Sequence, residues 1–369
     1  MSEILSQDLK INDIQETMEK VRNAANTNMV GQAALDLAND VVKSMFARQH
    51  YLAEGVPGVA KTQTAKNLSA AIYVGNVDLE TGDELPAPHT SSLALVKPYG
   101  RAQGAPDRQP ADILGAMIFN QKTGDFEAKP GPAVAHFVLF DEINRYRSPV
   151  QPAINELGSE GQITLGDQTI YLPKGFFMMG TMNPNVHGEG TNNQASSVAD
   201  RFGMSSFTDM PSADERYEAM QNRSTNSSSE EVPSRVFDMA QLPAYQDAIN
   251  RLVKFNPGVI RVGANILHRI LTDVQKDSKG NMTNPEYAKA PGFRAGDAVV
   301  DLARSKAAMA GQNRVDMDML TAENGLLYSV LRHRVVIDGD PQGKLNQMIA
   351  DAVKDNSTVL SREEAAAKI

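Results

Sequence analysis

Hydrophobic positions divide the chain into an N-terminal helical stretch, a middle part of alternating strands and helices, and a helical C-terminal part. In residues 8–48 apolar side chains recur at helical spacing, with Leu37 and Val41 on one face. Residues 51–208 alternate short apolar runs with helical stretches, and residues 236–335 follow a helical pattern. This alternation predicts an α/β fold with a parallel sheet covered by helices and ligands at the carboxyl ends of the strands, followed by an all-helical domain.

Two hairpins are expected to interrupt this plan. Residues 117–119 and 126–128 flank a polar turn, and residues 162–165 and 169–172 flank the turn Gly166-Asp167-Gln168. Residues 74–98 are rich in glycine, proline and acid and are expected to form a loop-like insertion.

Local signals suggest where the parts of the chain begin and end. Ser212-Ala213-Asp214-Glu215, after Pro211, predicts a capping box that opens a helix, and a serine-rich connection follows it. We therefore expect an N-terminal helical segment at 1–29, an α/β core at 30–221, a flexible connection at 222–235, a helical lid domain at 236–338 and a polar C-terminal tail at 339–369.

A glycine-containing segment between a predicted strand and a predicted helix is the first candidate for chemistry. Its backbone N–H groups and the helix N-terminus suit phosphate binding, with Lys61 reaching the terminal phosphates and Thr62 holding Mg²⁺. Ala60 stands where such loops usually have their second glycine, and by itself the segment also fits a glycine–proline turn before an ordinary helix. The predicted phosphate-binding residues are Gly55, Val56, Pro57, Gly58, Val59, Ala60, Lys61 and Thr62.

Two further strands end in polar residues. Residues 136–145 form an apolar run ending in Asp141 and Glu142, which suits one carboxylate near Mg²⁺ and one that polarises a water. We assign Asp141 to the metal and Glu142 to the water. Residues 176–184 form another apolar run, and its Asn183 is placed to hold that water from the opposite side. The three motifs in this order predict a nucleotide triphosphatase.

Composition excludes several other functions. The 369 residues include 36 basic and 45 acidic side chains, a net charge of -9 that disfavours an electrostatic grip on nucleic acid. No cysteine occurs, which excludes disulfides and thiolate chemistry, and the six histidines form no metal motif. The N-terminus has no basic start, and no run approaches ~18 apolar residues. A cytoplasmic protein without a membrane partner is expected.

Over about residues 30–338 the chain resembles the MoxR group of AAA+ ATPases. The resemblance rests on these segments: 54–62 (EGVPGVAKT), 103–115 (QGAPDRQPADILG), 120–132 (NQKTGDFEAKPGP), 141–145 (DEINR), 160–162, 181–184, 189–191, 200–202, 292–295 and 331–334 (LRHR). The chain departs from the group in its longer insertion at 74–98 and in Phe293, which stands where a step from a small residue to a proline is common.

The resemblance implies a five-stranded AAA+ core, a helical lid, and a homo-hexameric ring that binds ATP and Mg²⁺ between subunits. It implies that Arg201 is an arginine finger for the neighbouring subunit and that Arg294 is the lid arginine called sensor 2. Val30 and Gln32 resemble the segment that contacts adenine. The two hairpins would face the ring centre or the substrate. A protein with a von Willebrand factor A domain and a client complex are the implied partners.

Several alternatives stay open at this stage. Arg201 and Arg294 also fit ordinary surface ion pairs, and Arg145 or Arg147 could act in trans instead. A nucleic-acid remodelling motor would share the ATPase core but should carry basic central hairpins, whereas residues 117–128 hold one lysine and residues 162–172 none. A non-catalytic ring scaffold would not need Glu142, Asn183 and Arg201.

Overall fold

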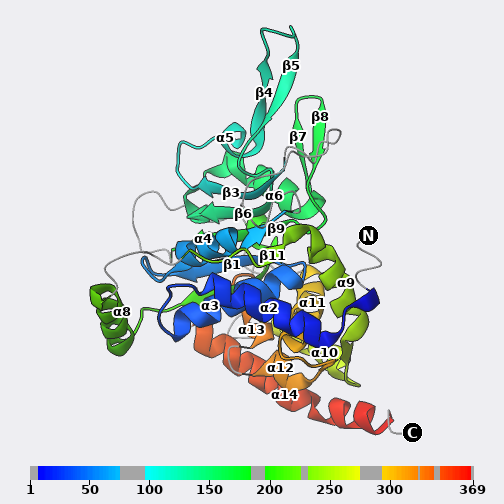
Figure 1. Ribbon diagram of the computed structural model, residues 1–369. Helices are drawn as coiled ribbons and strands as arrows, with labels where there is room; N and C mark the ends of the chain where they lie inside the picture. Colours follow the sequence, from blue (N-terminus) through cyan, green and yellow to red (C-terminus); the bar gives the residue numbers. More distant parts are fainter. Residues whose placement is uncertain are drawn as a thin grey trace.

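The computed structural model describes residues 7–74, 96–183, 196–225, 232–274, 293–322, 325–335 and 341–366. A five-stranded sheet forms its centre, in the spatial order β10-β1-β9-β6-β3 (Figure 1). Every pairing within this sheet is parallel, which confirms the predicted sheet. The strands are β1 (His50–Gly55), β3 (Lys97–Gln103), β6 (Ala135–Asp141), β9 (Phe177–Met182) and β10 (Phe202–Thr208).

Each face of the sheet has its own hydrophobic cluster because successive side chains of a strand point to opposite faces. Phe137 and Leu139 of β6 join a cluster with α2, α3 and α4, whereas Val138 and Phe140 join a cluster with α5, α6 and α7. All seven residues of β6 are buried, which explains its continuous apolar run. The covering helices are α2 (Ile11–Ala25), α3 (Gln32–Phe46), α4 (Lys61–Ala71), α5 (Pro110–Leu114), α6 (Gln151–Glu160) and α7 (Ser196–Ala199).

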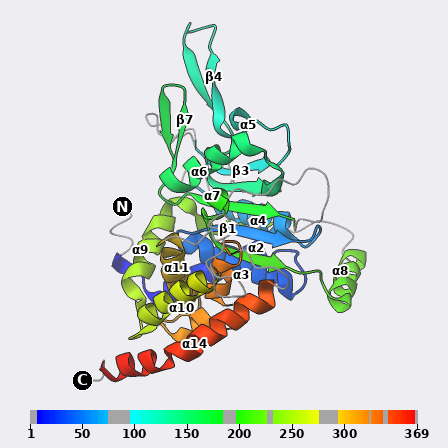
Figure 2. The same ribbon diagram turned by 180° about the vertical axis from the view of Figure 1, so that it is seen from behind.

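The C-terminal helices lie beyond the β10 edge of the sheet and share the cluster of α2 and α3 (Figure 2). They are α9 (Leu242–Leu252), α10 (Val259–Val274), α11 (Phe293–Met309), α12 (Met317–Thr321), α13 (Leu326–Leu331) and α14 (Pro341–Ala366). The helical C-terminal part is thus confirmed. Short parallel pairs are added by β12 (Lys254–Phe255) with β13 (Arg314–Val315) and by β11 (Phe237–Asp238) with β2 (Ile72–Tyr73). In the part of the chain that the structure describes, no helix is both long and apolar enough to cross a membrane.

Both predicted hairpins are present and extend from the β3 side of the molecule (Figure 1). In the first, β4 (Gly115–Phe119) pairs with β5 (Phe126–Pro130), as expected. In the second, β7 (Gln162–Leu165) pairs with β8 (Gln168–Tyr171), so that the turn is one residue shorter than predicted. Gln168 belongs to the strand because Gly166, with φ +61°, allows a two-residue turn.

One local prediction is confirmed in the structure, and two others differ from it. The capping box forms, because Ser212 and Glu215 each accept a hydrogen bond from the other's backbone N–H. Helix α8 (Ala213–Thr225) then continues into the predicted connection, so residues 222–225 are helical. The predicted polar tail contains α14. Its buried Leu345 and Ile349 join the hydrophobic cluster that includes α2, α3 and α4. The domain limits stay a prediction.

Several sequence expectations lie outside the described residues. They concern residues 226–231 of the connection, residues 75–95 of the insertion, and the matched positions Pro184, 189–191 and Gly292.

Candidate functional site

The loop between β1 and α4 contains residues with positive φ. Gly55 has φ +156°, and a Cβ there would lie 2.4 Å from the backbone oxygen of Thr208 on the neighbouring strand. Ala60 adopts a left-handed conformation with φ +68° immediately before α4, at a cost of roughly 1–2 kcal/mol for a residue with a side chain. No side chain caps the N-terminus of α4. The first N–H groups of this helix are therefore available to an anion.

Lys61 is the first residue of α4 and is buried. Its Nζ donates hydrogen bonds to the backbone oxygen of Gly55, to that of Val56 at 2.8 Å and to Asn183 Oδ1 at 3.2 Å. Burial lowers the pKa of Lys61, while the charges of Asp141 and Glu142 oppose that shift. An ammonium held this way is oriented toward the centre of the loop.

Asp141, at the end of β6, has partners on both carboxylate oxygens. Thr181 Oγ1 and Thr62 Oγ1 donate to its Oδ1 at 2.6 and 3.1 Å, and Arg101 Nη2 donates to its Oδ2 at 2.6 Å. Burial alone would raise the pKa of Asp141, but the hydrogen bonds from Thr181, Arg101 and Thr62 lower it below its usual value. The carboxylate is thus held in its charged form.

Glu142 follows in a left-handed backbone conformation with φ +54°, which is costly for a residue other than glycine and is typical of functional sites. Its Oε2 accepts hydrogen bonds from Gln103 Nε2 at 3.0 Å and from Arg145 Nη1 at 2.8 Å. Its backbone N–H donates to Thr181 Oγ1 at 2.9 Å. The side chain is therefore directed at the same end of the sheet as Asp141.

These side chains share one cleft at the carboxyl ends of the strands. Its volume of about 430 Å³ suits a small molecule. The structure brings together nine of the predicted residues here, namely Pro57, Gly58, Val59, Ala60, Lys61, Thr62, Asp141, Glu142 and Asn183. The remaining lining residues are Gln63, Lys66, Arg101, Gln103 and Thr181.

Arg201 lies at the other end of the sheet. It immediately precedes β10, and Phe202 pairs with His50 whereas Thr208 pairs with Gly55. At about 3.3 Å per residue, this places Arg201 roughly 17 Å or more from the phosphate loop of its own chain. Its guanidinium is therefore out of reach of Lys61 in the same chain.

Arg201 and Arg294 instead belong to one cluster around Asp200. Arg294 Nη1 lies 3.0 Å from Asp200 Oδ2, and Arg334 Nε lies 3.1 Å from Asp200 Oδ1. Burial and the neighbouring charge of Arg294 lower the pKa of Arg201. Arg201 Nε donates to Asn155 Oδ1 at 3.3 Å, and its Nη1 has no hydrogen-bond partner among the described residues.

Val30 lies on the turn between α2 and α3, and Gln32 is the first residue of α3. Asn67 of α4 donates from Nδ2 to the backbone oxygens of Ala25 and Thr27, which ties this turn to the helix that begins at Lys61. The backbone N–H of Gln32 donates to Glu215 Oε1 at 2.8 Å. These hydrogen bonds hold the turn beside α4.

Several polar residues of these clusters were given no role from the sequence, among them Arg101, Gln103, Thr181, Asp200 and Arg334. Thr181 carried a usable signal, because it precedes Asn183 by two residues and so shares its strand face. Arg101 and Gln103 are likewise two residues apart on β3. Nothing in the chain indicated that β3 would lie beside β6.

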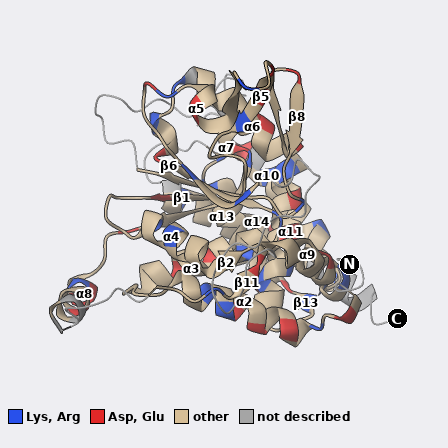
Figure 3. Cartoon of the chain, turned by 45° about the horizontal axis from the view of Figure 1, so that its top comes forward, with Lys and Arg blue, Asp and Glu red and all other residues tan. Residues whose placement is uncertain are grey.

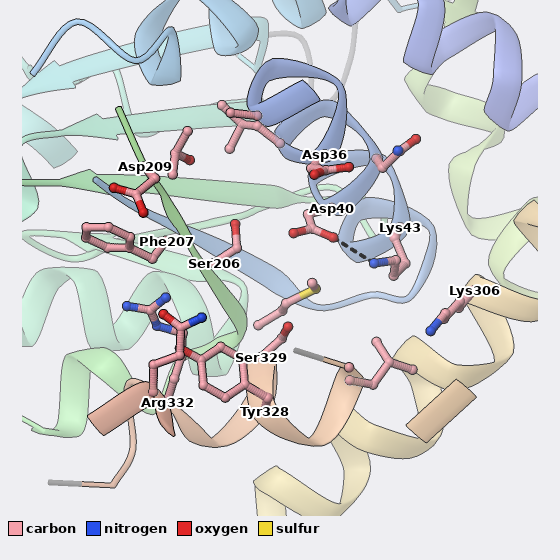
Figure 4. Close-up of a pocket in the computed structure, with 18 residues that line it drawn as sticks. Asp36, Asp40, Lys43, Ser206, Phe207, Asp209, Lys306, Tyr328, Ser329 and Arg332 are labelled. Atoms are coloured by element: carbon pink, nitrogen blue, oxygen red, sulfur yellow. Dashed lines mark hydrogen bonds and ion pairs between the residues drawn. The ribbon is translucent and has the colours of Figure 1, made fainter. Parts of the chain in front are cut away.

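A second cavity, of about 500 Å³, lies between α3, β10 and α13 (Figure 4). Both signs of charge line it, and Asp40 Oδ1 pairs with Lys43 Nζ at 2.7 Å. Arg332 also faces it and reaches Glu54 Oε2 at 3.2 Å. The cavity shares no lining residue with the cleft at the phosphate loop and contains none of the predicted site residues.

Comparison with known proteins agrees with this architecture. Residues 87–204 match the family described as "ATPase family associated with various cellular activities (AAA)". A crystal structure of a provisionally assigned ATPase from Cytophaga hutchinsonii superposes with a TM-score of 0.67 and 23% identity, covering 93% of this chain and 95% of that one. The fold and these matches define an AAA+ ATPase.

Two curated proteins narrow the assignment. The chain is 28% identical over 327 residues to the chaperone MoxR1 of Mycobacterium tuberculosis, which covers 88% of this chain and 77% of MoxR1. It is 34% identical over 190 residues to the uncharacterized protein YeaC of Bacillus subtilis, a match that spans about half of each chain (52% and 51%). Within the AAA+ class, the chain is similar to the MoxR family, as its motifs had indicated.

Proposed function

We propose that the protein is an Mg²⁺-dependent ATPase that completes its active site between two copies of the chain and uses hydrolysis to remodel, activate or assemble a client protein. The main support is the single cleft in which Lys61, Asp141 and Glu142 meet at the carboxyl ends of parallel strands. Such an edge is where open α/β sheets bind ligands.

The residues of the cleft fit both ATP and Mg²⁺. The uncapped N-terminus of α4 and the Lys61 ammonium would hold the phosphates. Thr62 Oγ1 and Asp141 Oδ1 lie 3.1 Å apart and offer the oxygen ligands that Mg²⁺ prefers alongside phosphates and waters. A bound Mg²⁺ would neutralise charge on the phosphates. Val30 and Gln32 are proposed to contact the base.

Glu142 and Asn183 are proposed to act on the attacking water. Glu142 would accept its proton as general base, and Asn183 would orient it from the neighbouring strand. Lys61 Nζ already contacts Asn183 Oδ1. The amide thus lies within one hydrogen bond of the group that would meet the terminal phosphate.

The distance between Arg201 and its own phosphate loop supports hydrolysis in trans. Arg201 and Arg294 lie together at the amino end of β10, so both would be offered to an adjacent subunit. A head-to-tail contact of this type repeats around a closed ring, and we propose a homo-hexamer.

A protein client is favoured over nucleic acid. The relative MoxR1 is named a chaperone. Basic and acidic residues are interspersed along the described chain rather than gathered in a basic stripe (Figure 3). We propose a cytoplasmic protein that works with a von Willebrand factor A domain partner on a client complex.

Phosphate release by the purified protein tests the enzymatic part of this proposal. Turnover should require ATP and Mg²⁺ and should stop in excess EDTA. Lys61→Ala should lose ATP binding by calorimetry, because the positive charge at the terminal phosphates is gone. Lys20→Ala, which removes an exposed lysine of α2, is the matched control. Unchanged ATP affinity in Lys61→Ala would contradict the assignment of the loop.

A further inference from the structure

Arg101 occupies a position in the cleft that the proposed mechanism does not use. Its Nη2 lies 2.6 Å from Asp141 Oδ2, on the carboxylate assigned to magnesium. The same nitrogen donates to Gln103 Oε1 at 2.6 Å. The arginine side chain is 42% exposed, whereas that of Asp141 is 6% exposed. The guanidinium thus covers the carboxylate from the solvent side.

Gln103 extends this arrangement to the second acid. Residues 101 and 103 are two positions apart on β3, so their side chains lie on the same face of the sheet. Gln103 pairs with Asp141 in the parallel register of β3 and β6. Gln103 Nε2 donates to Glu142 Oε2 at 3.0 Å. Two neighbouring side chains of one strand therefore hold both carboxylates of the cleft.

Charge balance explains why Asp141 has a cationic partner. A buried carboxylate is stable only when it is paired and hydrogen-bonded. Lys61 and Lys66 also line the cleft, and the Lys61 ammonium is directed at the Gly55 and Val56 oxygens and at Asn183. Arg101 therefore supplies the neutralising charge.

A guanidinium and Mg²⁺ cannot both occupy this place at low cost, because two like charges at one carboxylate repel each other. Arg101 is long and half-exposed, so it can leave Asp141 without unfolding the strand. Its departure would also remove the donor that orients Gln103.

We propose that Arg101 is a stand-in for magnesium, neutralising Asp141 until Mg²⁺ arrives with ATP and then moving aside, so that Gln103 releases Glu142. This inference rests on the proposed function. Arg101 is a positioning residue, and it raises the Mg²⁺ concentration that nucleotide binding requires.

Binding of a fluorescent N-methylanthraniloyl-ATP, measured in EDTA and across a series of Mg²⁺ concentrations, tests this without turnover. In Arg101→Gln the half-saturating Mg²⁺ concentration should fall roughly two- to fivefold, the range expected when a half-exposed ion pair no longer competes. Nucleotide affinity in EDTA should stay within about twofold, since Arg101 contacts the acid and not the phosphates.

Two variants serve as controls, and thermal unfolding shows that each is folded. Arg101→Lys keeps the charge and should stay close to wild type. Lys97→Gln removes an exposed charge elsewhere on β3 and should change nothing. Arg101→Met repeats the test with a side chain that cannot hydrogen-bond.

Two results would overturn the inference while leaving the proposed function intact. One is an unchanged Mg²⁺ dependence in both Arg101→Gln and Arg101→Met. The other is a selective loss of ATP over ADP affinity at saturating Mg²⁺, which would make Arg101 a phosphate ligand. If the wild-type protein binds no nucleotide at all, the proposed function fails, and the inference fails with it.

Discussion

Lys61 Nζ and Asn183 Oδ1 lie 3.2 Å apart, although 122 positions separate the two residues along the chain. They meet because β1 and β9 are neighbours in the sheet and both end at the same edge. In the proposed mechanism the ammonium faces the terminal phosphate and the amide faces the attacking water. Phosphate binding at Lys61 would then free Asn183 Oδ1 to hold that water.

Glu142→Gln should separate binding from hydrolysis. The amide keeps the shape of the side chain but cannot take a proton from water, so turnover should fall by about 10²- to 10⁴-fold. Calorimetry should show ATP affinity close to that of wild type. Glu16→Gln, at an exposed position of α2, is the control. Near-normal phosphate release in Glu142→Gln would remove this residue from the mechanism.

Much of this site could be predicted because its residues stand at the ends of recognisable apolar runs. Asp141 and Glu142 terminate the fully buried β6, and Asn183 follows the buried β9. The phosphate loop was predicted despite Ala60 because the apolar runs ending at Asp141-Glu142 and Asn183 accompany it. In the structure Ala60 adopts the left-handed conformation that a glycine would have.

The remaining contacts depend on which strands and helices lie side by side. Local sequence patterns do not show this order. Arg101 meets Asp141 only because β3 lies beside β6 in a register that pairs Gln103 with Asp141. The cluster of Arg201, Arg294 and Arg334 depends on how α11 and α13 pack at the β10 edge. Helical periodicity predicts such helices but not their neighbours.

Thr181 should be needed for the stability of the cleft. Its hydroxyl donates to Asp141 Oδ1 and accepts from the Glu142 N–H, so Thr181→Val leaves the Glu142 N–H unpaired and removes one of the two donors to Asp141 Oδ1. We expect a loss of about 1–3 kcal/mol in the free energy of unfolding, measured by urea denaturation. Thr181→Ser keeps the hydroxyl and should recover most of it. Equal stability of Thr181→Val and wild type would contradict these bonds.

Burial of His136 predicts a pH-dependent stability. It lowers the folded-state pKa of this histidine from 6.5 to about 4, so the unfolded chain takes up the proton first as the pH falls. The stabilising effect is complete above pH 6.5 and is lost progressively toward pH 4. At pH 5 the loss relative to pH 8 should be on the order of 2 kcal/mol.

Urea denaturation of His136→Leu at both pH values isolates this contribution. The difference between pH 8 and pH 5 should shrink by about that amount relative to wild type. His268→Gln, at an exposed position, is the matched control. If the free energy of unfolding of His136→Leu differs between pH 8 and pH 5 as much as that of wild type, His136 takes up the proton in the folded protein as readily as in the unfolded chain.

Arg201→Ala should leave ATP binding largely intact while abolishing most turnover, because the arginine acts on a neighbour's nucleotide. Removal of an arginine finger costs roughly 10³ to 10⁵ in rate. Phosphate release and calorimetry on the same preparation check both parts. Arg216→Ala, an exposed arginine of α8, is the control.

Mixing Arg201→Ala with Lys61→Ala tests donation in trans without any structure. Each variant lacks one half of the site, but a mixed ring contains some interfaces that join an intact phosphate loop to an intact Arg201. Those interfaces should recover part of the activity under conditions in which wild-type subunits exchange. If the mixture stays as inactive as each variant alone, Arg201 does not act across the interface. If Arg201→Ala alone hydrolyses ATP normally, the finger is another residue, and Arg145 and Arg147 are the next to test.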